Sequence, residues 1–179
     1  MAANARKSPQ EEARKILAEL KITQPPVPIE KVARHLGAKI RFSPFDGEIS
    51  GMIYIQDGLP IIGVNSLHPP NRQRFTIAHE CGHLILHRNL ITQEVHVDKK
   101  FPVLRRDDKS TTGTELIEIE ANRFAAELTM PRALLLRALG NDVIDIDDTD
   151  LVNKLAQQFK MSSDAMTIRM TSLFGREFL

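Results

Sequence analysis

Two histidines and a glutamate lie near the middle of the chain at the spacing of a zinc site. Residues 79–83 read His-Glu-Cys-Gly-His, inside the segment RFTIAHECGHLILHR. On a helix, residues four apart share one face, so His79 and His83 can direct ring nitrogens at one ion. Glu80 lies about 100° round the helix from His79, where it can reach a water molecule on that ion without binding the ion itself.

This arrangement fits metal-assisted hydrolysis. Zinc held by three protein ligands keeps a fourth position for water and lowers the pKa of that water to about 7. A carboxylate such as that of Glu80 can take the proton from the water and pass it to a leaving amine. The five-residue motif fixes only three positions, however, so the prediction depends on finding a third ligand.

A third histidine from the same segment is excluded. Asn89 stands six residues after His83, and Leu86 replaces the glycine of the extended metzincin pattern. His87 shares the face of His83 but lies one turn further along the helix. We therefore expect His87 to pack against the site or to orient a ligand, rather than to bind the ion.

Carboxylates for the third position are available on a second predicted helix, from about Thr114 to Thr129. With a period of 3.6 residues, one stripe of this helix carries Glu118, Ala121, Asn122 and Ala125. The small residues would let the helix pack against the histidine helix, so Glu118 is the predicted third ligand. Asn122, one turn later, would orient Glu118 or a histidine.

Two other carboxylates on the same helix stay open as ligands. Glu120 is the fallback, although it shares with Arg123 and Glu127 a charged stripe that is expected to face solvent. Glu115 is the weaker alternative because it lies close to the helix start. The choice among the three depends on how the two helices pack.

Local signals predict the elements that must position these residues. Helices are expected near residues 8–20, 28–37, 69–88, 114–129, 131–140, 149–160 and 162–174, and strands at 38–43, 49–55 and 59–65. Capping boxes are expected from Ser8 to Glu11 and from Thr112 to Glu115, and Ser162 should cap the last helix. Asp-Gly turns separate the strands, which favours an antiparallel meander. Residues 89–113 are mostly polar and are expected to be irregular.

The bulk composition is that of an ordinary soluble protein. The 179 residues are 42% hydrophobic and 26% charged, with 24 basic against 23 acidic residues and a formal charge of +1. This balance gives no electrostatic reason to expect binding to DNA or to anionic membranes. The single cysteine, the lack of a signal-peptide apolar run and the lack of about 18 consecutive apolar residues predict a cytoplasmic protein.

Several residues near the motif have simpler interpretations. Cys81 projects roughly opposite to His79 and is expected to be a small buried apolar residue. Tyr54, His87 and His96 could each stabilise the oxyanion of a tetrahedral intermediate, and the sequence assigns that role to none of them. An open edge of the predicted sheet could pair with an extended substrate.

The last two helices look like a helix–turn–helix, but they lack the basic residues that read DNA. Arg169 is the only internal basic residue of the second helix, and Arg176 lies just past its end. We expect their apolar residues to pack against the domain or a partner instead: Leu151, Leu155, Phe159, Met166, Ile168 and Met170.

Three segments in order, RFTIAHECGHLILH, RRDDKSTTG and EIEANRFAAELTMP, resemble the core signature of the ImmA/IrrE family of bacterial and phage metallo-endopeptidases. The similarity continues upstream through PVPIEKVARHLGAKIRF and ISGMIYI, so it covers about residues 10 to 135. It implies a zincin-type α+β fold, two histidines and a glutamate as zinc ligands, and action on helix-turn-helix repressors. The chain departs from the family at Thr129, usually Leu, and at Cys81, usually a bulkier apolar residue, and neither position bears on the expected chemistry.

We therefore predict one α+β, zincin-like (gluzincin-type) domain over residues 1–179, with a core at about 10–135 and a C-terminal helical extension at about 141–175. A small, mostly antiparallel three-stranded sheet would accompany the histidine helix, the Glu-ligand helix and the C-terminal helices.

The predicted function is zinc-dependent hydrolysis of a peptide bond in a partner regulatory protein. Zn2+ would be bound by His79, His83 and Glu118, with Glu80 as the base. A helix-turn-helix repressor is the expected substrate, and its cleavage would relieve repression in mobile-element, toxin-antitoxin or stress-response control. The alternative is a zinc-binding module that controls a repressor by association, without cleavage. Neither nucleic acid nor a membrane is expected as a direct partner.

Overall fold

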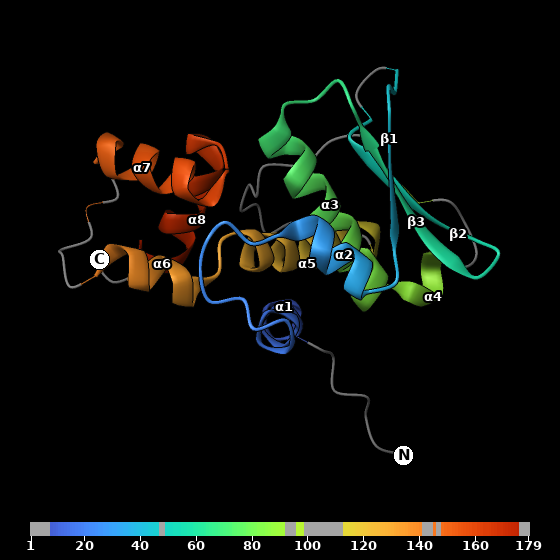
Figure 1. Ribbon diagram of the computed structural model, residues 1–179, viewed down its shortest axis with the longest axis horizontal. Coiled ribbons are helices and arrows are strands. Elements are labelled where there is room, and N and C mark those ends of the chain that lie inside the picture. Colours follow the sequence, from blue (N-terminus) through green and yellow to red (C-terminus); the bar gives the residue numbers. More distant parts are fainter. Residues whose placement is uncertain are drawn as a thin grey trace, which may run out of the picture.

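The computed structural model describes residues 8–46, 49–91, 96–98, 113–140, 145 and 148–175. In chain order its elements are α1 (Pro9–Glu19), α2 (Ile29–His35), β1 (Lys39–Ser43), β2 (Gly51–Gln56), β3 (Leu59–Asn65), α3 (Pro70–Leu86), α4 (Arg88–Ile91), β4 (His96–Asp98), α5 (Gly113–Thr129), α6 (Arg132–Leu139), α7 (Thr149–Phe159) and α8 (Ser163–Phe174). Helices α3 and α5 lie at the centre, between the sheet on one side and α6, α7 and α8 on the other (Figure 1). The α+β class is the predicted one.

The sheet has the strand order β1-β3-β2-β4 within the described residues. β2 and β3 form an antiparallel hairpin, and both Asp57 and Gly58 in its turn have positive φ, which suits an Asp-Gly turn. β1 pairs with β3 in parallel, and β4 pairs with β2 antiparallel. The sheet is therefore mostly antiparallel, as predicted.

The predicted three-stranded meander is wrong in two respects. β1 lies beside β3 instead of β2, and a fourth strand comes from the segment that was expected to be irregular. The apolar run of β3 explains the order, because its residues from Pro60 to Asn65 are all buried. A strand buried on both faces belongs in the interior of a sheet, whereas β1 is mostly exposed and suits an edge.

Helices α3 and α5 approach closely at Gly82. A Cβ placed on Gly82 would lie 3.1 Å from Ala121 Cα, 3.2 Å from Ala121 O and 3.2 Å from a ring carbon of Phe124. Ala121 and Ala125 are fully buried. The small residues predicted to let the two helices meet are thus confirmed in that role, and the close approach brings the two predicted ligand helices together.

The predicted helix caps have mixed outcomes. Ser162 does cap α8, since its hydroxyl accepts a hydrogen bond from Ala165 N at 3.2 Å. Ser8 precedes α1 without a side-chain capping bond, and its hydroxyl donates to Gln10 Oε1 at 3.4 Å, so the capping box predicted there is wrong. Thr112, of the second predicted capping box, lies outside the described residues.

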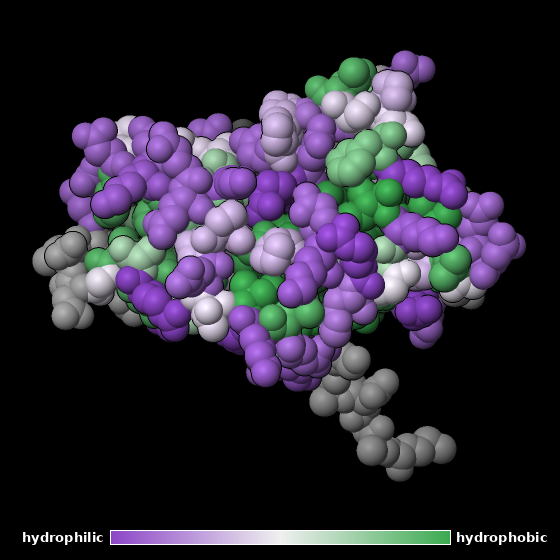
Figure 2. All heavy atoms as spheres, viewed as in Figure 1, coloured by the Kyte–Doolittle hydropathy of each residue, from purple (hydrophilic) through white to green (hydrophobic). Residues whose placement is uncertain are grey.

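Apolar side chains from the helices and the sheet form one hydrophobic core. The large side chains that are fully buried include Ile29, Ile53, Ile62, Ile77, Leu84, Phe124, Leu128, Leu135, Leu155 and Phe159. Hydrophilic residues dominate the face of the molecule seen in Figure 2. Among the described residues, none of the helices combines the length and the apolar character needed to span a bilayer.

The C-terminal helices α7 and α8 contribute apolar residues to the common core, and a buried ion pair joins α8 to α5. Arg169 of α8 is 7% exposed, forms an ion pair with Glu127 of α5 and donates to Met130 O at 3.0 Å. Glu127 is 2% exposed, so its predicted place on a solvated stripe is wrong. Ile168 is exposed, so it does not pack against the domain, and the predicted alternative of packing against a partner stays a prediction. The buried position of Arg169 removes it from any nucleic-acid-reading surface, and Arg176 lies outside the described residues.

Candidate metal centre

Helix α3 carries the two motif histidines on one buried face, and both contact Glu118 of α5. His79 and His83 are 0% and 1% exposed, and their Nε2 atoms lie 2.9 Å apart. Glu118 of α5 places Oε2 3.2 Å from His79 Nε2 and Oε1 3.5 Å from His83 Nε2. Two helices that are distant in the chain thus bring two imidazoles and a carboxylate to one point.

The spacing of these three groups suits a metal ion. One potential ligand atom from each of His79, His83 and Glu118 lies within 4.8 Å of the other two. Donors about 2.0–2.2 Å from a tetrahedrally coordinated zinc ion are separated from one another by about 3.3–3.6 Å. The observed separations of 2.9, 3.2 and 3.5 Å are close to that range. The group could therefore hold a metal ion without a large rearrangement.

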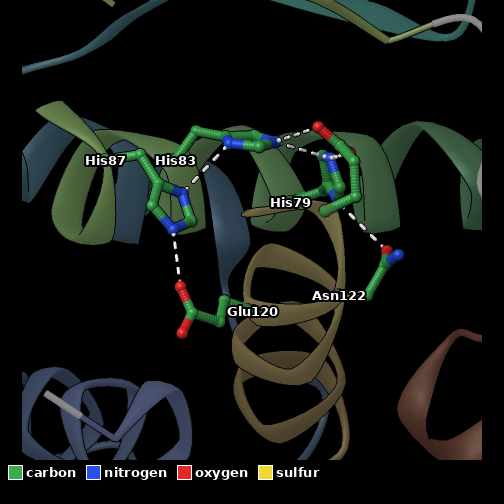
Figure 3. Close-up of polar contacts among 6 residues, drawn as sticks. His79, His83, His87, Glu120 and Asn122 are labelled. Atoms are coloured by element: carbon green, nitrogen blue, oxygen red, sulfur yellow. Dashed lines mark hydrogen bonds and ion pairs between the residues drawn. The ribbon is translucent and has the colours of Figure 1, made fainter. Parts of the chain in front are cut away.

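His79 is oriented by an amide on α5. Its Nδ1 lies 3.0 Å from Oδ1 of Asn122, which is 4% exposed (Figure 3). Because an amide oxygen only accepts hydrogen bonds, His79 donates through Nδ1, and its Nε2 lone pair points toward Glu118. Asn122 thus has the orienting place that the helix periodicity predicted for it.

The Nδ1 atom of His83 contacts a third histidine, His87. His87 lies one turn further along α3, with its Nδ1 3.3 Å from His83 Nδ1 and its Nε2 2.9 Å from Glu120 Oε2 (Figure 3). Glu120 therefore contacts His87 and is not part of the ligand group, and His87 has a place from which it can orient a ligand. The pairing of His87 with Glu120 was missed in the sequence, although a third histidine at the same helical spacing was a signal that a buried partner was needed.

Glu80 is fully buried between α3 and the sheet. A Cβ on Gly51, at the start of β2, would lie 3.3 Å from Glu80 Oε1 and 2.3 Å from Thr76 Cγ2. Only glycine at this position lets the strand approach α3 so closely. Glu80 follows His79 directly but stays outside the three-residue ligand group, which is the arrangement expected for a base beside a metal ligand.

Cys81 is a buried residue of the core, as predicted. Burial raises the pKa of its thiol, and the charge of Glu80 raises it further. A thiol in this state is a poor nucleophile and a poor metal ligand. The structure therefore gives Cys81 a packing role beside the motif histidines.

The remaining candidates lie away from the ligand group or outside the described residues. Tyr54 accepts a hydrogen bond from Arg41 at 3.5 Å. It alternates along β2 with the buried Ile53, which faces the core, so its ring lies on the opposite face of the sheet. Glu115 is exposed near the start of α5. The side chain of His96 is outside the described part of the chain.

A profile for the family Peptidase_M78, described as the IrrE N-terminal-like domain, matches residues 33–171. The match begins in α2, ends in α8 and contains all the residues of the candidate metal centre. The chain belongs to this family. The IrrE N-terminal-like domain is a peptidase-type domain, and the family predicted from the sequence motifs is confirmed. The match also includes α6 and α7, beyond the core region in which the motifs lie.

In its fold, this IrrE N-terminal-like domain is similar to a solved structure of a Mycobacterium tuberculosis transcriptional regulator, with a TM-score of 0.60 and 17% sequence identity. The similarity covers 91% of this chain and 46% of the regulator, so the chain spans about half the length of that protein. At this identity the similarity shows the fold alone. The comparison with curated proteins gave no match.

Proposed function

We propose that this IrrE N-terminal-like domain is a zinc-dependent endopeptidase in which His79, His83 and Glu118 hold the ion. The observation that supports this most strongly is the convergence of their three donor atoms at nearly tetrahedral spacing. Two imidazoles and one carboxylate form a ligand set used by catalytic zinc, with a fourth position open to water. The peptidase-type family supports hydrolysis of a peptide bond as the reaction.

Each protein group then has a defined task. When bound, the zinc ion supplies a Lewis acid that lowers the pKa of water and polarises the substrate carbonyl. Glu80 accepts a proton from the attacking water as the water oxygen forms a bond to the carbonyl carbon. Glu80 then gives that proton to the nitrogen as the carbon–nitrogen bond breaks. Asn122 holds the ring of His79 in the orientation that presents Nε2.

The proposed substrate is a partner regulatory protein, specifically a helix-turn-helix repressor. The resemblance of the motifs to the ImmA/IrrE family motivates this proposal, and the name of the structurally similar transcriptional regulator is in keeping with it. Cleavage of the repressor would remove it from its operator and so relieve repression. A single buried cysteine suits a reducing compartment, and we propose that the protein acts in the cytoplasm.

The Glu80→Gln variant tests the enzyme proposal. The variant keeps the shape of the side chain and the three proposed ligands but loses the base, so it should retain one equivalent of zinc. Cleavage of the helix-turn-helix regulator encoded next to the gene should fall by about 10²- to 10⁴-fold. Fragments are measured by mass spectrometry, with and without a chelator.

Two controls separate loss of the base from loss of the metal. Glu118→Ala should lose both zinc and cleavage, while Glu115→Ala, an exposed change on the same helix, should lose neither. Derepression that persists undiminished in Glu80→Gln would support regulation by association and would rule out the peptidase mechanism.

A further inference from the structure

A row of side chains connects the proposed zinc ligand His83 to a carboxylate on the opposite helix. His87 is 9% exposed, and its two ring nitrogens contact His83 Nδ1 at 3.3 Å and Glu120 Oε2 at 2.9 Å (Figure 3). Glu120 comes from α5, the helix that also carries Glu118. The row lies on the side of His83 away from its Nε2, which faces the ligand group.

With Glu120 ionised and His87 neutral, the direction of each hydrogen bond follows. An ionised carboxylate only accepts, so His87 donates to Glu120 through Nε2. In a neutral imidazole with a proton on Nε2, Nδ1 is an acceptor. His87 therefore accepts from His83 Nδ1, which leaves the Nε2 lone pair of His83 directed toward Glu118 and the proposed ion.

His79 also has its proton on Nδ1, but there a single hydrogen-bond partner is sufficient to place it. Its Nδ1 donates directly to Asn122 at 3.0 Å, so one acceptor is enough. The Nδ1 of His83 faces another imidazole, that of His87, which can accept or donate according to its own tautomer. A second group must therefore decide the tautomer of His87, and the carboxylate of Glu120 is placed to do so.

We propose that His87 and Glu120 are positioning residues that hold His83 in its zinc-binding tautomer and ring orientation. This inference rests on the proposed zinc site. Outer partners of ligating histidines typically contribute 10- to 100-fold in metal affinity. The row thus sets how tightly the site binds zinc, although neither residue touches the ion.

Zinc affinity of the full chain, measured by competition with a chromophoric chelator, tests the proposal. Glu120→Ala and His87→Phe should each weaken zinc binding by about 10- to 100-fold. Glu120→Gln keeps an acceptor oxygen and should recover most of the affinity. The matched control Glu115→Ala removes a carboxylate from an exposed position on the same helix and should bind zinc like the wild type.

A spectroscopic readout separates positioning from a general structural role. In zinc-loaded protein with ¹⁵N-labelled histidine, His83 should show a protected Nδ1–H signal, which Glu120→Ala should lose and Glu120→Gln should keep. Wild-type affinity together with an unchanged His83 signal in Glu120→Ala would overturn the inference while leaving the zinc site in place. Failure of the wild-type chain to take up zinc would overturn both the proposed function and this inference.

Discussion

Gly82 lies on α3 between the two motif histidines, where it closely approaches the backbone of α5 at Ala121. The atoms that a Cβ there would meet belong mainly to the backbone of Ala121, which cannot turn aside as a side-chain tip can. The distance between the histidines and Glu118 therefore depends on the absence of a single methyl group. Gly51 also needs the absence of a Cβ, because a methyl group there would collide with the side chain of Thr76 and crowd that of Glu80.

Gly82→Ala should destabilise the protein and weaken zinc binding together. An ordinary Gly→Ala change inside a helix stabilises by about 0.5–1 kcal/mol, whereas forcing an extra methyl group into a packed interface costs about 1–3 kcal/mol. We expect a net loss of about 1 kcal/mol in the free energy of unfolding, measured by urea denaturation. Zinc affinity should fall because Glu118 moves away from the histidines. A variant at least as stable as the wild type would show that α3 and α5 can accommodate the added methyl group without a steric clash.

At the scale of elements, α8 is attached to α5 by the buried pair of Arg169 and Glu127. Burial lowers the pKa of Arg169, and the neighbouring carboxylate opposes that shift, so the guanidinium is charged at neutral pH. The other carboxylate oxygen of Glu127 has no hydrogen-bond partner among the described residues. The pair therefore depends on both members being present.

Arg169→Met should cost about 3–5 kcal/mol of unfolding free energy, because it leaves the Glu127 carboxylate buried without its partner. The double variant Arg169→Met with Glu127→Leu should be much closer to the wild type, since a buried ion pair and an apolar pair of similar volume are often nearly equal in stability. Chemical denaturation of the two variants measures the difference. Equal destabilisation in both would mean that packing around α8, and not the unpaired charge, decides the stability.

The elements also show where sequence reasoning succeeds and where it stops. The bounds of α3 and α5 and the faces that carry His79, His83 and Glu118 follow from a period within each helix, so they could be predicted. The place of β1 beside β3 depends on contacts between segments that no local period records. The burial of Glu127 was missed for the same reason, because its partner Arg169 lies on another helix. The row from His83 to Glu120 likewise becomes visible only when α3 and α5 are placed together.

For the molecule as a whole, zinc binding and folding should be coupled, and Cys81 offers a probe of that coupling. The thiol is fully buried in the core, so an alkylating reagent reaches it only when the structure opens. A ligand that binds only the folded state stabilises it by about 2.7 kcal/mol at a hundredfold excess over its dissociation constant. If opening at Cys81 is global, labelling should slow by about 100-fold when zinc is added at that excess.

Mass spectrometry of the intact protein measures the labelling rate. Glu118→Ala is the control, since a chain that has lost a proposed ligand should be labelled at the same rate with and without zinc. Wild-type labelling that ignores zinc would contradict the coupling.

Exposure is unequal among the three candidate ligands: the side chains of His79 and His83 are 0% and 1% exposed, whereas that of Glu118 is 20% exposed. Protein thus encloses the imidazole side, and among the three candidate ligands the Glu118 carboxylate has most of the exposed surface. An incoming ion, the water that reacts and the peptide to be cut would all reach the site from the solvent-exposed side at Glu118. Removal of the ion by a chelator should then be slow even where affinity is modest. A peptide bound at this exposed side would block the chelator and slow the release of the ion further.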